Sequence, residues 1–187
     1  MHKTYALFDF ELNQKKGKTI QEFVSLALRK SALYLQYRDK INSKDIKIKN
    51  IKKLRELYSG VIIVNDDISL VPFCDGLHLG QEDLSKFGSD ASEAVKIIRE
   101  QIGDKILGLS THNLKEIEIA NRLNLDYIGL GAYRETTTKD ISNLLGEKLP
   151  YLAKNSKHKV AAIGGVKYSD KISNIEFLVL GSSIYEN

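Results

Sequence analysis

Charged side chains of both signs follow apolar, β-rich segments of this sequence. Arg38 and Lys40 come after "ALYLQY", and Lys139 follows three threonines later in the chain. Two carboxylates, Asp66 and Asp83, end the segments "VIIVND" and "HLGQED". Magnesium takes oxygen ligands, and proteins hold it with one or two carboxylates together with phosphate oxygens and water. If these five side chains converge, each charge finds a partner once a magnesium ion and a pyrophosphate group lie between them.

Glycine-rich endings after two later apolar segments indicate a second anion site. Gly164 and Gly165 end "VAAIGG", and Gly181 and Ser182 follow "FLVL". Backbone N–H groups at such positions bind phosphate, and glycine permits a close approach of the backbone. Two phosphorylated ligands are therefore indicated, one bound through metal and one bound by backbone. Solvent-exposed turn chemistry remains the alternative interpretation of the polar residues that end "VIIVNDD".

The elements that must position these residues alternate between short apolar strands and amphipathic helices. We expect strands at Tyr5–Phe10, from Ala32, from Val61, from Asp75, from Lys105, from Asp126, at Val160–Gly165 and at Phe177–Ser183. Helical periodicity covers Thr19–Arg29, Ile46–Leu57, Ala91–Ile102, Leu114–Leu123 and Ile141–Ala153. Strands that are apolar on both faces favour a parallel sheet covered by helices. Eight such units favour a closed (β/α)8 TIM barrel, with an open doubly wound sheet as the alternative.

The chain is short for such a barrel, in which ~250 residues are typical. We predict a single domain over residues 1–187, and therefore a minimal barrel. The third helix after Asp67 is short, the seventh is shortened within "KYSDKISNIE", and the eighth is essentially missing after Ser183. Active sites of this fold lie at the carboxyl ends of the strands, where the following loops converge. The polar strand endings are therefore expected to form one ring.

Composition narrows the class of protein. The sequence is 42% hydrophobic and 28% charged, as in soluble globular domains. No apolar run approaches the ~20 residues of a membrane span, and the N-terminus lacks signal-peptide features. The net charge is +4, but the lysines alternate with apolar residues at helical spacing, so we expect no nucleic-acid partner. Cys74 is the lone cysteine, which favours a cytoplasmic location, and we interpret it as a core residue.

The remaining polar residues suggest no nucleophilic catalysis. The sequence shows no convincing Ser–His–Asp or Cys–His arrangement. His78 alternates with Leu77 and Leu79, which is typical of a packed, hydrogen-bonded barrel residue rather than a ligand. Asp67 is expected to cap the short third helix.

Taken together and in order, the polar segments resemble the thiamine-phosphate synthases. The matching segments are "QYRDK", "IIVNDD", "GLHLGQED", "GLSTH", "TTTK", "AIGG" and "GSSI". The resemblance implies a barrel enzyme that joins hydroxymethylpyrimidine diphosphate to thiazole phosphate. It also implies a dissociative substitution that releases pyrophosphate, with Mg²⁺ as cofactor and a homodimer as the assembly.

Residue roles follow from the same resemblance. Asp66 and Asp83 are the implied magnesium ligands. The implied substrate-binding residues are Gln36 at the pyrimidine, Arg38, Lys40, Asn65 and Lys139 at the diphosphate, Ser110 beside both, and Thr136, Thr138, Gly165, Gly181 and Ser182 at the thiazole phosphate. Arg38, Lys40, Ser110 and Lys139 are the residues expected to act in catalysis.

Three departures from the family pattern leave other functions open. Ala132 and Glu135 stand where the family usually has proline. A thiazole tautomerase-like enzyme and a non-catalytic barrel that binds thiamine precursors are the alternatives. The third departure is the shortened seventh helix and the missing eighth, which are expected to expose apolar barrel surface that a partner subunit would cover.

Overall fold

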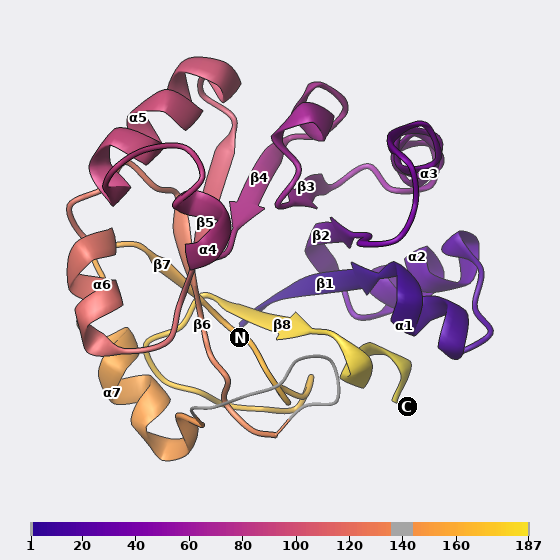
Figure 1. Ribbon diagram of the computed structural model, residues 1–187. Helices are drawn as coiled ribbons and strands as arrows, with labels where there is room; N and C mark the ends of the chain where they lie inside the picture. Colours follow the sequence, from indigo (N-terminus) through magenta and orange to yellow (C-terminus); the bar gives the residue numbers. More distant parts are fainter. Residues whose placement is uncertain (1, 136–143, 187) are drawn as a thin grey trace.

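Eight parallel strands form a closed barrel in the computed structural model, which describes residues 2–135 and 144–186 (Figure 1). They are β1 (Lys3–Asp9), β2 (Ala32–Arg38), β3 (Val61–Asn65), β4 (Gly76–Leu79), β5 (Ile106–Thr111), β6 (Tyr127–Leu130), β7 (Lys159–Ala162) and β8 (Phe177–Leu180). Each strand pairs with the next, and β8 closes the ring on β1, where Lys3 lies opposite Phe177. The predicted (β/α)8 barrel is confirmed, and the open-sheet alternative is wrong.

The helices in or near the predicted helical segments lie outside the ring of strands (Figure 1). They are α2 (Ile20–Arg29), α3 (Lys44–Leu57), α5 (Ala91–Ile102), α6 (Leu114–Ala120) and α7 (Leu149–Ala153). All five fall within or close to the predicted helical segments, and residues 141–143 of the last segment lie outside the described residues. Local caps explain several starts: the Thr19 side chain accepts from Glu22 N, and Asp90 and Asn113 cap α5 and α6.

Short helices complete the connections. Periodicity missed α1 (Phe10–Lys15) and α4 (Gln81–Leu84), which are too short to show a repeating apolar face. Within residues 2–135 and 144–186 the 3-10 helices are η1 (Ile68–Phe73), η2 (Gly146–Lys148) and η3 (Ser182–Tyr185). η1 is the short third helix that the sequence predicts, and Asp67 caps it by accepting from Ser69 N at 3.1 Å.

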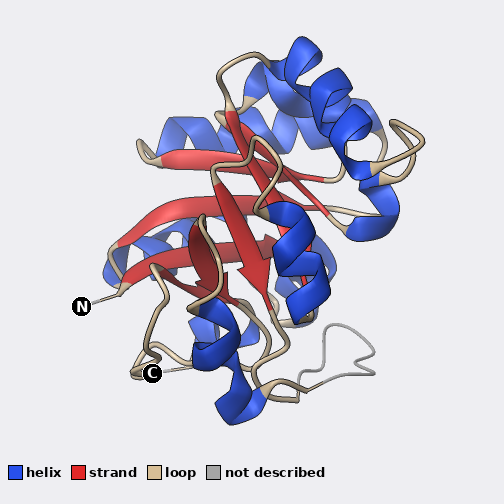
Figure 2. Ribbon diagram, turned by 90° about the vertical axis from the view of Figure 1, so that its left-hand side faces the viewer, coloured by secondary structure: helices blue, strands red, loops and turns tan. Residues whose placement is uncertain are grey.

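The barrel has apolar side chains on both sides of its wall. Tyr5, Ile63, Tyr127 and Phe177 fill the interior. A larger core of buried side chains involves both strands and helices, and Figure 2 shows helices lying against the outside of the strands. All residues of β4, β6 and β8 are buried, because each strand is covered on both faces.

The connection from β7 to β8 is more reduced than expected. The described residues between these strands form no helix, so the seventh helix is lost rather than shortened. A turn held by Asp170 takes its place: the carboxylate accepts from Lys167 N at 2.8 Å and forms an ion pair with Arg134. Val166 and Ile172 of this connection are buried against the barrel without a helix.

The chain itself covers β8. η3 stands where an eighth helix would begin, and its Ile184 is fully buried. All residues of β8 are at most 4% exposed. The expected apolar gap is therefore absent from the described surface around β8, and the homodimer stays a prediction without that argument.

Among the described residues, the helices are too short or too polar to cross a lipid bilayer. The predicted cytoplasmic location is not tested by this observation and stays a prediction.

Candidate active site

A polar cleft of about 450 Å³ opens at the carboxyl ends of β2, β3 and β4. It is lined by Asp39, Lys40, Lys47, Asn65, Asp66, Asp67, Ile68, Asp83 and Lys86. These residues come from the ends of three consecutive strands and from the connections that follow them, because neighbouring strands of a parallel barrel end at the same rim. The structure thus brings together four of the predicted site residues, namely Lys40, Asn65, Asp66 and Asp83.

Asp66 lies where the chain turns out of β3. Its φ of +63° is in the left-handed region, which aspartate tolerates better than most residues. The Asp66 N–H donates to the carbonyl of His78 at 2.9 Å, which ties the turn to β4. Asn65 Nδ2 donates to Asp66 Oδ2 at 2.5 Å. The polar residues after β3 are therefore held in a defined arrangement that faces the cleft.

The carboxyl groups of Asp66 and Asp83 lie close enough to share a hydrogen bond. Burial, and after it the negative charge of Asp83, raises the pKa of Asp66. Burial also opposes the charge of Asp83, but hydrogen bonds from Lys86 and with Asp66 outweigh it and lower the pKa of Asp83. The pair therefore favours a shared proton or a cation between its oxygens.

This pair fits magnesium. Two carboxylates at a cleft, with room for phosphate oxygens and water, are the protein ligands that magnesium needs. The described part of the chain holds no cluster of three or more His, Cys, Asp or Glu side chains that would suit a metal with only protein ligands. The oxygen-only donor set also disfavours a softer metal.

Arg38 lies at the end of β2 and is held by a residue that the sequence analysis missed. Its guanidinium forms an ion pair with Asp9, which lies opposite it in the register of β1 and β2. The Asp9 side chain is buried and also caps α1 by accepting from Leu12 N at 2.9 Å. The signal that could have found Asp9 is its position as the only charged residue in the apolar segment "YALFDF", near the end of a predicted strand. Lys47 and Lys86, which line the cleft, were also missed. Lys47 lies in a lysine-rich predicted helical segment, and no pattern in the sequence around Lys86 singles it out.

Gln36 and Ser110 reach inward rather than into the cleft. Gln36 is buried and donates from Nε2 to the Tyr5 hydroxyl at 2.8 Å. Ser110 Oγ lies 2.9 Å from His78 Nε2, and the Ser110 carbonyl accepts from Gln81 Nε2 at 2.6 Å. The prediction that His78 is a hydrogen-bonded barrel residue is confirmed.

The glycines after β7 have close neighbours within the chain. Gly165 has a φ of +62°, and a Cβ there would lie 2.7 Å from Arg134 Cβ and 2.8 Å from Glu135 O. Arg134 also binds this turn directly, by donating to the Gly165 carbonyl at 3.0 Å and by pairing with Asp170. The glycine is therefore required by the packing of two loops, whether or not a phosphate binds there.

The other residues predicted for the thiazole phosphate are only partly placed. Gly181 precedes η3, and Ser182 begins it, at the carboxyl end of β8. Thr136, Thr138 and Lys139 lie outside the described residues. Ala132 and Glu135, which depart from the family pattern, lie in the loop after β6; Tyr133 N and Arg134 N of this loop donate to the carbonyls of Ile163 and Gly164.

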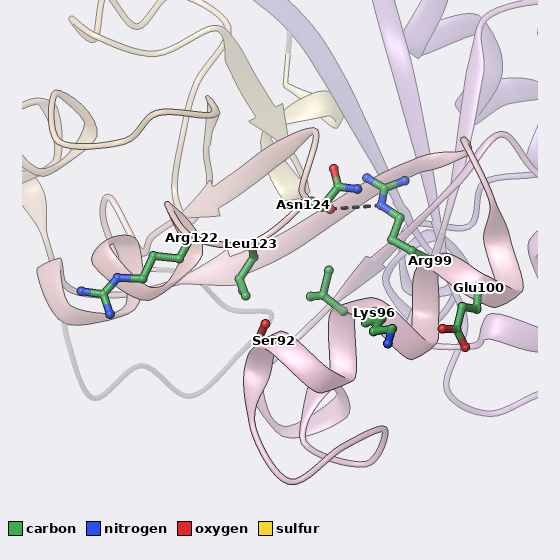
Figure 3. A pocket seen from close by; sticks show the side chains of 8 residues that line it. Ser92, Lys96, Arg99, Glu100, Arg122, Leu123 and Asn124 are labelled. Carbon is green, nitrogen blue, oxygen red and sulfur yellow. Dashed lines mark hydrogen bonds between the residues drawn. The ribbon is translucent and has the colours of Figure 1, made fainter.

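A second cavity, of about 490 Å³, lies between α5 and the turn before β6 (Figure 3). One of its two arginines, Arg99, donates to the Asn124 carbonyl at 3.0 Å (Figure 3) and pairs with Asp126. Asn124 and Asp126 precede β6, so this cavity lies at the amino ends of the strands, opposite the rim where this fold places active sites. Arg99 thus joins a helix to the barrel.

Comparison with known sequences identifies the family of this chain. Residues 5–176 match the family described as thiamine monophosphate synthase. A thiamine-phosphate synthase of Persephonella marina is 37% identical over 87% of this chain and 76% of that protein. One of Caldicellulosiruptor bescii is 35% identical over 89% of this chain and 76% of that protein. One of Nostoc punctiforme is longer: it is 37% identical over 76% of this chain, which covers 40% of that protein.

Solved structures of similar fold align with most of this chain. Thiamine phosphate pyrophosphorylase from Pyrococcus furiosus aligns with a TM-score of 0.72 and 22% identity over 95% of this chain and 84% of that chain. A chain of the tryptophan synthase complex of Pyrococcus furiosus aligns with a TM-score of 0.64 and 14% identity over 98% of this chain and 90% of that chain. At these identities the structural likeness shows the barrel fold alone, and proteins with this fold catalyse many different reactions. The sequence match over residues 5–176 decides the family: this chain belongs to the thiamine monophosphate synthases.

Proposed function

We propose that this chain is a thiamine-phosphate synthase, which couples hydroxymethylpyrimidine diphosphate with thiazole phosphate to give thiamine phosphate and pyrophosphate. The observation that carries the proposal is the cleft in which Lys40, Asn65, Asp66 and Asp83 meet, in a chain of this family. Both signs of charge face one cavity there, which suits a chelated diphosphate.

The substitution is dissociative, so its main demand is to stabilise negative charge on the departing diphosphate. Lys40 lines the cleft, and Arg38 lies two residues before it at the end of β2. Lys139 supplies a third cation in this proposal. Removing one preorganised electrostatic contact of this kind commonly costs ~3–4 kcal/mol of barrier, or ~10²–10³ in rate.

Magnesium is the proposed cofactor, with Asp66 and Asp83 as its protein ligands. When bound, it supplies positive charge to the diphosphate oxygens and so makes the diphosphate a better leaving group. Asn65 holds the Asp66 carboxylate in place through its 2.5 Å hydrogen bond. The Lys86 ammonium pairs with Asp83 Oδ1 in the structure and would compete with the metal for this oxygen.

The pyrimidine is proposed to lie near Gln36 and Ser110, at the mouth of the barrel. The thiazole phosphate is assigned to Thr136, Thr138, Gly165, Gly181 and Ser182. The thiazole nitrogen attacks the methylene carbon of the pyrimidine cation, and the electron pair of the broken C–O bond leaves with the pyrophosphate. No protein nucleophile is required.

The test is to mix the full chain with both substrates and magnesium and to measure thiamine phosphate and pyrophosphate. We expect equal amounts of both products, and their loss when the metal is chelated. Asp66→Asn should lower the rate by ~10²-fold or more. Glu82→Gln is the matched control, because Glu82 is an exposed neighbour of Asp83 that does not line the cleft.

Two other outcomes would contradict the proposal. Binding of the pyrimidine diphosphate with magnesium, without any release of pyrophosphate, would indicate a non-catalytic binding barrel. Aromatisation of a thiazole carboxylate without any need for magnesium would indicate a tautomerase.

A further inference from the structure

Five polar side chains form one continuous series of hydrogen bonds through the barrel interior, and we name it the lumen network. Gln36 Nε2 lies 2.8 Å from the Tyr5 hydroxyl, which lies 2.8 Å from the Tyr127 hydroxyl. The Tyr127 hydroxyl lies 2.9 Å from His78 Nδ1, and His78 Nε2 lies 2.9 Å from Ser110 Oγ. The series crosses from β2 through β1, β6 and β4 to β5. Its two ends are residues that the proposed function places at the pyrimidine diphosphate.

The sequence leaves space for this network. A Cβ on Gly108 would lie 2.2 Å from the Tyr127 ring, and a Cβ on Gly129 would lie 3.2 Å from the His78 ring. Tyr5 and Tyr127 are each 1% exposed, and the His78 and Tyr127 rings stack with centroids 5.5 Å apart. Buried polar groups this well satisfied specify one arrangement of the interior.

The chemistry of the groups gives the network one direction. The Gln36 amide nitrogen can only donate, so the Tyr5 oxygen accepts from it and the Tyr5 proton goes to Tyr127. Tyr127 then donates to His78 Nδ1, which leaves the imidazole proton on Nε2, facing the Ser110 oxygen. The reverse order fails at Tyr5, whose proton would face a nitrogen that cannot accept.

The tyrosines keep their protons throughout. Burial, ahead of every other cause, raises the pKa of both Tyr5 and Tyr127. Their hydroxyls are therefore donors at any pH at which the protein works. Since Ser110 accepts from His78, its own proton is left for an acceptor outside the network.

We propose that the lumen network is a positioning device: Tyr5, Tyr127 and His78 fix its two ends and reserve the hydroxyl proton of its serine for an anionic oxygen of the bound ligand. The identity of that ligand rests on the proposed function. The order of donors does not, because it follows from the free protein.

The first experiment therefore measures the His78 tautomer in the free full-length protein. Long-range ¹H–¹⁵N NMR of histidine-labelled protein separates the two neutral tautomers, and His78→Gln assigns the signals. We expect the Nε2–H form in the wild type and a mixture of both forms in Tyr127→Phe. An Nδ1–H form in the wild type would overturn the proposal, as would a Tyr127→Phe spectrum like that of the wild type.

Tyr58→Phe is the matched control. The Tyr58 hydroxyl is also buried, but it donates to the Ala32 carbonyl at 2.8 Å, outside the lumen network. The control removes a buried hydroxyl of the same kind, so we expect a comparable loss of stability with no change in the His78 tautomer. A change as large as that of Tyr127→Phe would show a general effect of buried hydroxyl loss and refute the assignment.

Kinetics test the role of the serine end. Loss of one well-placed hydrogen bond to the ligand lowers affinity or rate by about tenfold. We therefore expect kcat/KM for the pyrimidine diphosphate to fall about tenfold in Tyr127→Phe and to stay within about twofold of the wild type in Tyr58→Phe. If the network acts through Ser110, the double variant Tyr127→Phe/Ser110→Ala loses no more than Ser110→Ala alone. Fully additive losses would overturn the positioning role. If the wild type makes no thiamine phosphate, the proposed function fails, and the NMR result decides on the network by itself.

Discussion

Replacing Gly165 by alanine tests whether this glycine serves the packing of two loops or only the approach of a phosphate. In the structure, Gly165 has a φ of +62° and lies against the backbone of the loop after β6. Gly17 has the same φ of +62°, and a Cβ there would meet no atom within 4 Å. Alanine at either position would have the same positive φ, and the two positions differ in whether a new Cβ would meet other atoms.

The magnitude follows from these contacts. A left-handed conformation destabilises the folded state by about 1–2 kcal/mol when the residue is alanine. Alanine also lowers the conformational entropy of the unfolded chain, which offsets about 0.4–1 kcal/mol of this loss. Gly17→Ala should therefore lower the free energy of unfolding by about 1.6 kcal/mol or less. In Gly165→Ala, the new Cβ lies 2.7 Å from Arg134 Cβ and 2.8 Å from Glu135 O, so atoms must shift. Overpacking of this kind adds about 1–3 kcal/mol.

Thermal unfolding of the ligand-free protein measures the difference. One kcal/mol shifts the melting temperature of a domain of this size by about 2–4 °C, so a difference of about 2 kcal/mol corresponds to about 4–8 °C. We expect Gly165→Ala to melt lower than Gly17→Ala by that amount, with no phosphate present. Urea unfolding gives an independent free energy for the same pair.

Equal melting temperatures for the two variants would refute the packing argument. If Gly165→Ala then raised the KM for thiazole phosphate while Gly17→Ala did not, the glycine would be required by the ligand alone. A lower melting temperature together with a raised KM would show that the same loop contact also shapes the phosphate site.

Three further predictions concern the cleft and the core. Asp83→Asn should weaken magnesium binding in the presence of the pyrimidine diphosphate by at least about tenfold, measured by calorimetry, because it leaves one charged ligand, Asp66; unchanged affinity would exclude Asp83 as a ligand. Asp9→Asn keeps an oxygen to cap α1 but frees Arg38, so diphosphate affinity should fall about threefold to tenfold; tighter binding would show that Asp9 only competes for the arginine. Burial raises the pKa of the Cys74 thiol to about 12, so at pH 8 it should not react with a thiol reagent until the protein is unfolded; rapid labelling of folded protein would contradict this.

The sequence by itself determined the eight strands, most of the longer helices and their order along the chain. Apolar strands that alternate with amphipathic helices are encoded by neighbouring residues, and so are caps such as Thr19 of α2 and Asp67 of η1. Because parallel strands in a closed barrel end at one rim, the positions of Lys40, Asp66 and Asp83 after consecutive strands were enough to predict that they meet.

Only the tertiary structure decided which side chains contact each other across the barrel. The Asp9–Arg38 pair depends on the register of β1 and β2, and the hydrogen bond between Tyr5 and Tyr127 joins residues 122 positions apart. The burial of β8 by η3 and a helix-free connection likewise depends on where the chain returns. Local periodicity reports which face of an element is apolar, but register and barrel closure fix its neighbours, and these arise from interactions of the whole chain.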